Sequence, residues 1–127
     1  MDTLIAGTGQ FAVSASLQTI GADVLITLWG GTRPHIGSLA VAIPHPQSAP
    51  ERERSSTVLQ FSFPGHRDEA VARRVAERVA ARLQRTVAAS AGIHVPDITP
   101  EGIEAVLANT DLLIQKIIGK LRSQAHD

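Results

Sequence analysis

The sequence predicts an α+β two-layer sandwich, in which two helices cover one face of a mainly antiparallel sheet of about five strands. Three observations support this fold class. Four short segments with strand periodicity lie in the first half of the chain, two longer segments with helical periodicity follow, and a fifth short strand separates the helices. The predicted order is β-β-β-β-α-β-α, and the 127 residues fit a single domain, 1–127.

Four segments have the periodicity of strands. Residues 11–20 alternate apolar and polar side chains, whereas 23–29 form an almost unbroken apolar run, typical of a strand covered on both faces. Further strands are predicted over 36–43 and 57–63, and the proline-rich segment 44–56 between them is expected to be a mobile loop. Within these last two strands, alternation places the larger apolar side chains together: Leu39, Val41 and Ile43, then Leu59, Phe61 and Phe63.

Two segments have the periodicity of amphipathic helices. From residue 67 to about 89, a valine and alanine stripe lies opposite five arginines, which we interpret as a solvated face. A fifth strand is predicted over 92–95. Thr99-Pro100-Glu101 then begins a second helix. Its apolar stripe continues through Asn109-Thr110, which predicts one long helix or two nearly collinear pieces, and its aliphatic end would favour self-association if the sheet left it uncovered.

Composition excludes several function classes. Twelve basic and twelve acidic side chains give a net charge of zero, which argues against a nucleic-acid partner. The absence of cysteine excludes disulfides, thiolate metal sites and a cysteine nucleophile. No apolar run is long enough for a membrane span and the first residues do not resemble a signal peptide, so a cytoplasmic protein is expected. The common nucleophile and nucleotide-binding motifs are absent, so we expect no catalytic residues.

A glycine and a histidine occur close together at three predicted strand boundaries. The first pairing is in the segment 30–37, the second is Gly65-His66, and the third is Gly92-Ile93-His94. Each alone is typical of an ordinary turn, a helix cap or a surface residue. The repetition favours one shared site, because glycine permits close backbone approach and histidine supplies a donor, an acceptor or a metal ligand.

Two kinds of ligand suit such a site. One is a planar phosphorylated cofactor, because backbone N–H groups, a hydroxyl and an arginine can bind an anion, while Trp29 and the Phe61/Phe63 pair offer flat surfaces. The other is a metal held by three imidazoles, with an open fourth position. The candidate cofactor residues are Gly30, Gly31, Thr32, Arg33, His35, Gly37, His66, His94 and Asn109, and the candidate metal ligands are His35, His66 and His94.

The same segments resemble a known family. LITLWGGTRPHIG at 25–37, PGHRDE at 64–69 and AGIHV at 91–95 are similar to the LpdD-like prenylated-flavin chaperones, and the similarity extends from about residue 11 to 121. The spaced combination GG-x3-HIG, GH-x2-E and AGIHV is far more specific than any one of its parts. One departure follows the last motif, where the family has an Asp-Asn pair and this chain has Val95-Pro96-Asp97-Ile98.

The resemblance implies a non-catalytic protein with a fold like that of proteasome-assembly chaperones. Such a protein would bind prenylated FMN, protect its reduced form and deliver it to a prenylated-flavin-dependent (UbiD-type) decarboxylase. A flavin prenyltransferase is a further expected partner, and a homo-oligomer is expected. Two alternatives remain open at this point: a three-histidine metalloprotein with hydrolytic activity, and a structural assembly factor without a ligand.

Overall fold

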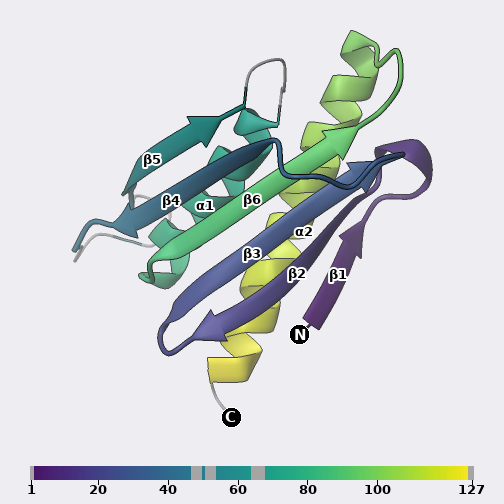
Figure 1. The fold of residues 1–127 in the computed structure, drawn as a ribbon. Coiled ribbons are helices and arrows are strands. Elements are labelled where there is room, and N and C mark those ends of the chain that lie inside the picture. Colours follow the sequence, from purple (N-terminus) through teal and green to yellow (C-terminus); the bar gives the residue numbers. More distant parts are fainter. Residues whose placement is uncertain (1, 47–49, 51–53, 64–67, 126–127) are drawn as a thin grey trace.

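The computed structural model describes residues 2–46, 50, 54–63 and 68–125. They form one six-stranded sheet, in the order β1-β2-β3-β6-β4-β5, with two helices behind it (Figure 1). The strands are β1 (Asp2–Ala6), β2 (Val13–Ile20), β3 (Asp23–Gly31), β4 (Ser38–Pro44), β5 (Ser56–Ser62) and β6 (Val87–His94). The other elements are the 3-10 turn η1 (Gly9–Phe11) and the helices α1 (Glu69–Leu83) and α2 (Pro100–Ala125).

The predicted fold class is confirmed, with one additional strand. Four of the five strand pairings are antiparallel and only β3 with β6 is parallel. The expected order lacked β1, which adds to the free edge of β2 and makes six strands rather than five. The first predicted strand began too early, because residues 9–11 form the turn η1 before β2 begins at Val13.

The boundary between α1 and β6 differs from the prediction. The helical stripe suggested a helix from residue 67 to about 89, but α1 ends at Leu83 and β6 already begins at Val87. Gln84 takes a left-handed conformation with φ 55°, which ends the helix, and its N–H donates to the carbonyl oxygen of Ala80. Val87 is buried as predicted, but on a strand, because helical and strand periodicity coincide over so short a segment.

The second helix is continuous. α2 passes through Asn109 and Thr110 without a break, which decides between the two predicted alternatives. Thr110 is fully buried, and its hydroxyl donates to the carbonyl oxygen of Val106 one turn earlier, so the polar group is satisfied within the helix. The aliphatic stripe near the end of α2 is fully used by the core: Leu113, Ile114, Ile117, Ile118 and Leu121 are each at most 2% exposed.

The helices cover only one face of the sheet. In Figure 1, α1 lies behind β4 and β6, and α2 lies behind β2 and β3. On β4 the small residues Ser38, Ala40 and Ala42 point toward the helices and are buried, whereas the larger residues that alternate with them are exposed. We call the uncovered side the open face. Its large exposed apolar residues on β4 and β5 are Leu39, Val41, Ile43, Leu59 and Phe61.

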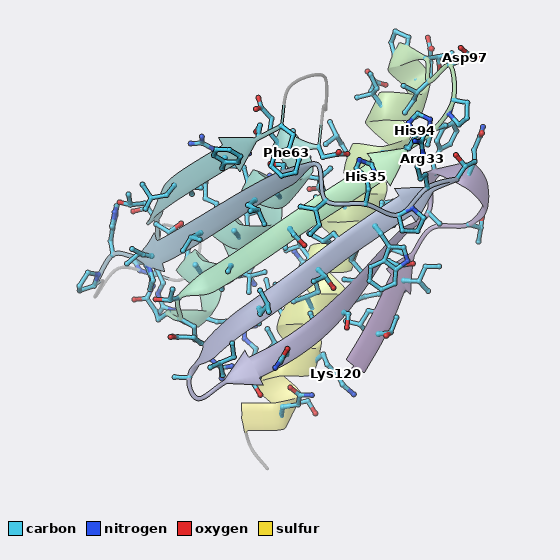
Figure 2. The ribbon with its side chains drawn as sticks, viewed as in Figure 1. Arg33, His35, Phe63, His94, Asp97 and Lys120 are labelled. Carbon is cyan, nitrogen blue, oxygen red and sulfur yellow. The ribbon has the colours of Figure 1, made fainter. Side chains whose placement is uncertain are left out.

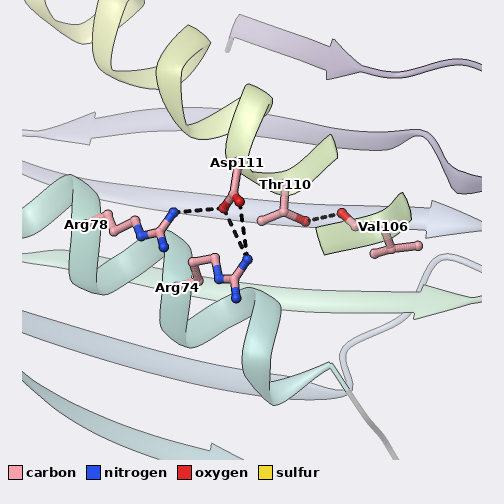
Figure 3. A network of polar contacts seen from close by, with 5 residues as sticks. All are labelled: Arg74, Arg78, Val106, Thr110 and Asp111. Atoms are coloured by element: carbon pink, nitrogen blue, oxygen red, sulfur yellow. Dashed lines mark hydrogen bonds and ion pairs between the residues drawn. The ribbon is translucent and has the colours of Figure 1, made fainter. Parts of the chain in front are cut away.

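Ionic contacts join the two helices on their outer side. Figure 3 shows Asp111 of α2 between two arginines of α1, at 3.2 Å from Arg74 and 2.8 Å from Arg78. The arginine face that the sequence suggested to be only solvated thus also links α1 to α2. Neither helix is long and apolar enough over its described residues to span a membrane.

Candidate functional site

The connection between β3 and β4 crosses the end of β6. Residues 32–37 form this connection, because β6 lies between β3 and β4 in the sheet (Figure 1). At one end, the N–H of Thr32 donates to the carbonyl oxygen of His94 at 2.8 Å, and the Thr32 hydroxyl donates to the same oxygen at 3.3 Å. At the other end, the N–H of Gly37 donates to the carbonyl oxygen of Ala91 at 2.9 Å. Both ends of the crossing segment are therefore held on β6.

Two glycines make this crossing sterically feasible. Gly92 lies against the backbone of His35, and a Cβ atom on Gly92 would overlap with the His35 carbonyl oxygen. Gly31 has φ +75°, and a Cβ atom there would overlap with the carbonyl oxygen of His94. The recurrence of glycine beside histidine at these boundaries thus has a steric reason: each glycine lets the backbone of a histidine pass closely.

A buried carboxylate joins the crossing segment to the first helix. Asp68, 5% exposed, immediately precedes α1, and its Oδ2 lies 3.3 Å from Nε2 of His35. Its Oδ1 accepts the N–H of Ile93 at 2.9 Å, so Asp68 contacts two segments far apart in sequence. The partial positive charge at the start of α1 favours a carboxylate in this position.

The imidazole of His35 is fixed by contacts on both nitrogens. Nδ1 donates to the carbonyl oxygen of Arg33 at 2.8 Å, while Nε2 faces the carboxylate of Asp68. Both nitrogens therefore face oxygen atoms of the protein. The side chain of His35 keeps 21% exposure, so it remains reachable from outside.

A pocket of about 310 Å³ lies on the helix side of this end of the sheet. It is enclosed by the start of α1, the end of β6, the loop that follows β6, and the first turns of α2. Eight of its lining residues are apolar: Ala70, Val71, Ile93, Val95, Ile98, Ile103, Val106 and Leu107. Asp68, His94 and Asp97 are the other three, so the pocket combines an aliphatic wall with a few polar groups, as small-molecule sites do.

The structure brings several of the candidate residues together. Figure 2 shows Arg33, His35, His94 and Asp97 at one end of the sheet, far from Lys120 at the other. Gly30 and Gly31 complete β3 at this end, and Gly37 ends the crossing segment. Phe61 and Phe63 form an edge-to-face pair with ring centroids 5.6 Å apart, and Figure 2 places Phe63 toward the same end.

One candidate, Asn109, is not part of this arrangement, and the structure does not describe another, His66. The amide Nδ2 of Asn109 donates to the carbonyl oxygen of Phe11 at 2.8 Å, so Asn109 fastens α2 to η1 and does not line the pocket. His66 lies outside the described residues, which leaves the three-histidine metal site as a prediction. Within the ranges that the structure describes, no three His, Asp or Glu side chains are grouped closely enough to hold a metal ion.

Sequence reasoning missed the residue that connects the site. Asp68 was not among the candidate residues, and its side chain makes no capping hydrogen bond within α1. Asp68 belongs to the segment 64–69 that carries the family resemblance, and this was the available signal. Nothing in the sequence marks the α2 residues that line the pocket, because Val106 and Leu107 continue an ordinary apolar stripe.

Comparisons with known proteins place the chain in a family. The model of the prenylated flavin chaperone LpdD-like domain matches residues 7–122. Protein LpdD of Lactiplantibacillus plantarum is 37% identical over 128 aligned positions, which cover 99% of this chain and 88% of the relative.

The fold also has a counterpart among solved structures. A chain from the crystal structure of a chaperone complex for yeast 20S proteasome assembly matches with a TM-score of 0.58 and 14% identity, covering 96% of this chain and 95% of that one. At this identity the match concerns the fold alone, and it confirms the expected likeness to proteasome-assembly chaperones. The family model and the 37% identical relative together show that the chain belongs to the LpdD-like family of prenylated flavin chaperones.

Proposed function

We propose that this protein is a non-catalytic chaperone that binds reduced prenylated FMN, protects it and delivers it to a UbiD-type decarboxylase. The observation that carries the proposal is the contact of His35 with Asp68, beside an aliphatic pocket that Asp68 and His94 line, in a chain of this family. A pocket with an apolar wall and few convergent polar groups suits the apolar part of a flavin nucleotide. The imidazole and guanidinium groups at this end of the sheet suit a nucleotide, because such groups bind polar ring edges and phosphate.

The phosphate is assigned to Arg33 rather than to the glycines. Gly30 and Gly31 pair with β6, and both donors of Thr32 already bind the carbonyl oxygen of His94, so these three residues shape the backbone. Arg33 is exposed at the site, and its guanidinium can donate two parallel hydrogen bonds to phosphate oxygens. In this assignment His35, whose two nitrogens face Arg33 and Asp68, orders the crossing segment beside the flavin nucleotide.

Protection and delivery place different demands on the site. Protection requires the reactive ring to be shielded from solvent, which a pocket between two helices and a sheet can provide. Delivery requires the ligand to leave again, so the ligand is held by noncovalent contacts alone. We infer that a decarboxylase accepts the ligand, that a flavin prenyltransferase supplies it, and that both exchanges occur in the cytoplasm.

We also propose that the protein forms a homodimer through the open face. The expected self-association surface on α2 is buried in the core, whereas Leu59 and Phe61 of the open face are 64% and 63% exposed. On strands β2, β3, β4, β5 and β6, the open-face positions away from the strand ends are Ser14, Ser16, Gln18, Leu25, Thr27, Trp29, Leu39, Val41, Ile43, Thr57, Leu59, Phe61, Ala88 and Ser90. None of these described positions carries a charge. A second copy could therefore pack against this surface without burying charges or opposing like charges.

Ligand binding tests the main proposal. Purified protein, titrated anaerobically with reduced prenylated FMN, is expected to bind it with a change in the absorbance spectrum. His35→Ala should weaken binding at least about tenfold, because the contact that joins the crossing segment to Asp68 is lost. His45→Ala is the matched control, since His45 bonds only Ser55 and Thr57 among its described partners, beyond the opposite end of β4. Absence of binding at micromolar protein would exclude the proposal.

Sedimentation tests the dimer. The wild-type protein is expected to sediment as a dimer at micromolar concentration, and Phe61→Glu as a monomer, because the charge would be buried at the interface. Leu112→Glu is the control, because Leu112 is a comparably exposed apolar residue (56%) on α2. A monomeric wild type, or a dimer that tolerates Phe61→Glu, would contradict the assigned interface.

A further inference from the structure

The pocket behind the sheet has a one-sided charge distribution. Its ionisable lining residues are Asp68, Asp97 and His94, and no Lys or Arg is among the described lining residues. The exposed Arg33 of the crossing segment lies outside this lining. Among the described lining residues, a phosphate dianion in the pocket would face two aspartates and no Lys or Arg, which is unfavourable at low dielectric.

The two oxygens of Asp68 are already engaged. One accepts the N–H of Ile93 and the other faces His35, so the carboxylate is turned toward protein partners on both sides. The rest of the wall is mostly aliphatic, with Val71 from α1 and Val106 and Leu107 from α2. Such a wall favours a hydrocarbon group over a polar one, because apolar burial is favourable and unsatisfied polar groups are costly.

The volume of the pocket limits what can enter it. Small-molecule sites enclose about 300–1,000 Å³, so 310 Å³ suits one portion of a flavin nucleotide rather than the whole. The phosphate is disfavoured by charge and the ribityl chain by its hydroxyl groups. The portion that matches the wall is the branched hydrocarbon unit by which prenylated FMN differs from FMN.

We propose that this pocket receives the prenyl-derived carbons and thereby selects prenylated FMN over unmodified FMN, while the phosphate stays outside near Arg33. This inference rests on the proposed function and adds the determinant of specificity. The residues that would enforce the selection come from α1, β6 and α2, and none of them belongs to the glycine-rich crossing segment.

Filling the pocket tests this assignment. Ala70 lies in the first turn of α1, is exposed and lines the pocket, so Ala70→Phe narrows it without disturbing the core. Ala108→Phe is the matched control, because Ala108 is also an exposed helical alanine but does not line the pocket. Dissociation constants of reduced prenylated FMN and reduced FMN are measured for the wild type and both variants.

The expected result is a change in the ratio of the two constants. The wild type should prefer prenylated FMN by at least about tenfold, since even a single methylene in an apolar pocket can give 10- to 200-fold discrimination. Ala70→Phe should bring the ratio near one by weakening only the prenylated ligand, and Ala108→Phe should leave it unchanged. Equal wild-type affinities, an unchanged ratio in Ala70→Phe, or equal weakening of both ligands would overturn the inference and leave the proposed function standing. A wild type that binds neither flavin would overturn both.

Discussion

The two faces of β4 carry side chains of opposite size. The helix-covered side has Ser38, Ala40 and Ala42, all fully buried, whereas the open face has Leu39, Val41 and Ile43, which are 41%, 37% and 48% exposed. Small residues on the covered side suit the close approach of α1, whose inner stripe contains Ala72, Ala76 and Ala80. Whether a side chain of β4 is buried therefore depends on which face the helices cover, and not on the size of the side chain.

The largest expected difference between the two sides of the sheet is in the stability lost when a leucine on each side is truncated to alanine. Leu113→Ala removes a fully buried side chain of α2 and should lower the free energy of unfolding by about 2–5 kcal/mol, because it leaves a cavity in the core. Leu59→Ala on the open face should change the stability of the monomer by less than about 0.5 kcal/mol. Urea unfolding at protein concentrations low enough for a monomer gives both values. Similar losses in the two variants would mean that the open face is covered within the monomer.

A smaller contrast is expected where two neighbouring alanines face opposite ways. Ala89→Leu on β6 forces extra atoms between the sheet and the helices, and should cost about 1–3 kcal/mol of unfolding free energy. Ala88→Leu adds the same atoms on the open face, where space is available, and should cost less than about 0.5 kcal/mol. Thermal unfolding of the pair measures the difference. A larger loss of stability in Ala88→Leu than in Ala89→Leu would mean that Ala88, and not Ala89, faces the helices.

The smallest expected effect concerns the ion pairs that join α1 and α2 on their outer side. Asp111→Asn removes the partner of Arg74 and Arg78 and should destabilise by about 0.2–1 kcal/mol, because these groups are largely solvated. The loss should shrink at high salt, where exposed ion pairs are screened. Urea unfolding at low and high salt concentration checks this, with Glu104→Gln on the same helix as the control. A loss that does not depend on salt would show that the link between the helices is not ionic.

The fold was largely predictable because the periodicities were clear. Alternation identified both sides of β4 and β5, but it could not tell which side the helices cover, since both sides of β4 are mainly apolar. Strand β1 was missed because the short segment 2–6 gains its partner only from β2. The end of α1 was misplaced because a left-handed Gln84 leaves little signal in the sequence.

The site was predictable only in part. The motifs that contain His35 and His94 occur at strand boundaries, and the structure places both residues at one end of the sheet. They could not show that Asp68 connects His35 to the N–H of Ile93, because this contact depends on how α1 packs against β6. Asn109 interrupts an apolar stripe. The sequence alone cannot distinguish an asparagine that binds a ligand from one that, as here, donates to the backbone carbonyl oxygen of Phe11.

The position of β6 between β3 and β4 has a consequence for folding kinetics. Strands β3 and β4 follow each other in the chain, yet each pairs with β6, which is formed much later by residues 87–94. Pairings of such long sequence separation are slow to form, and until β6 enters, the facing edges of β3 and β4 lack this partner. The crossing segment can be fastened only after that step. Competence to bind a ligand should therefore appear only once β6 has paired, and would report on that step in refolding experiments.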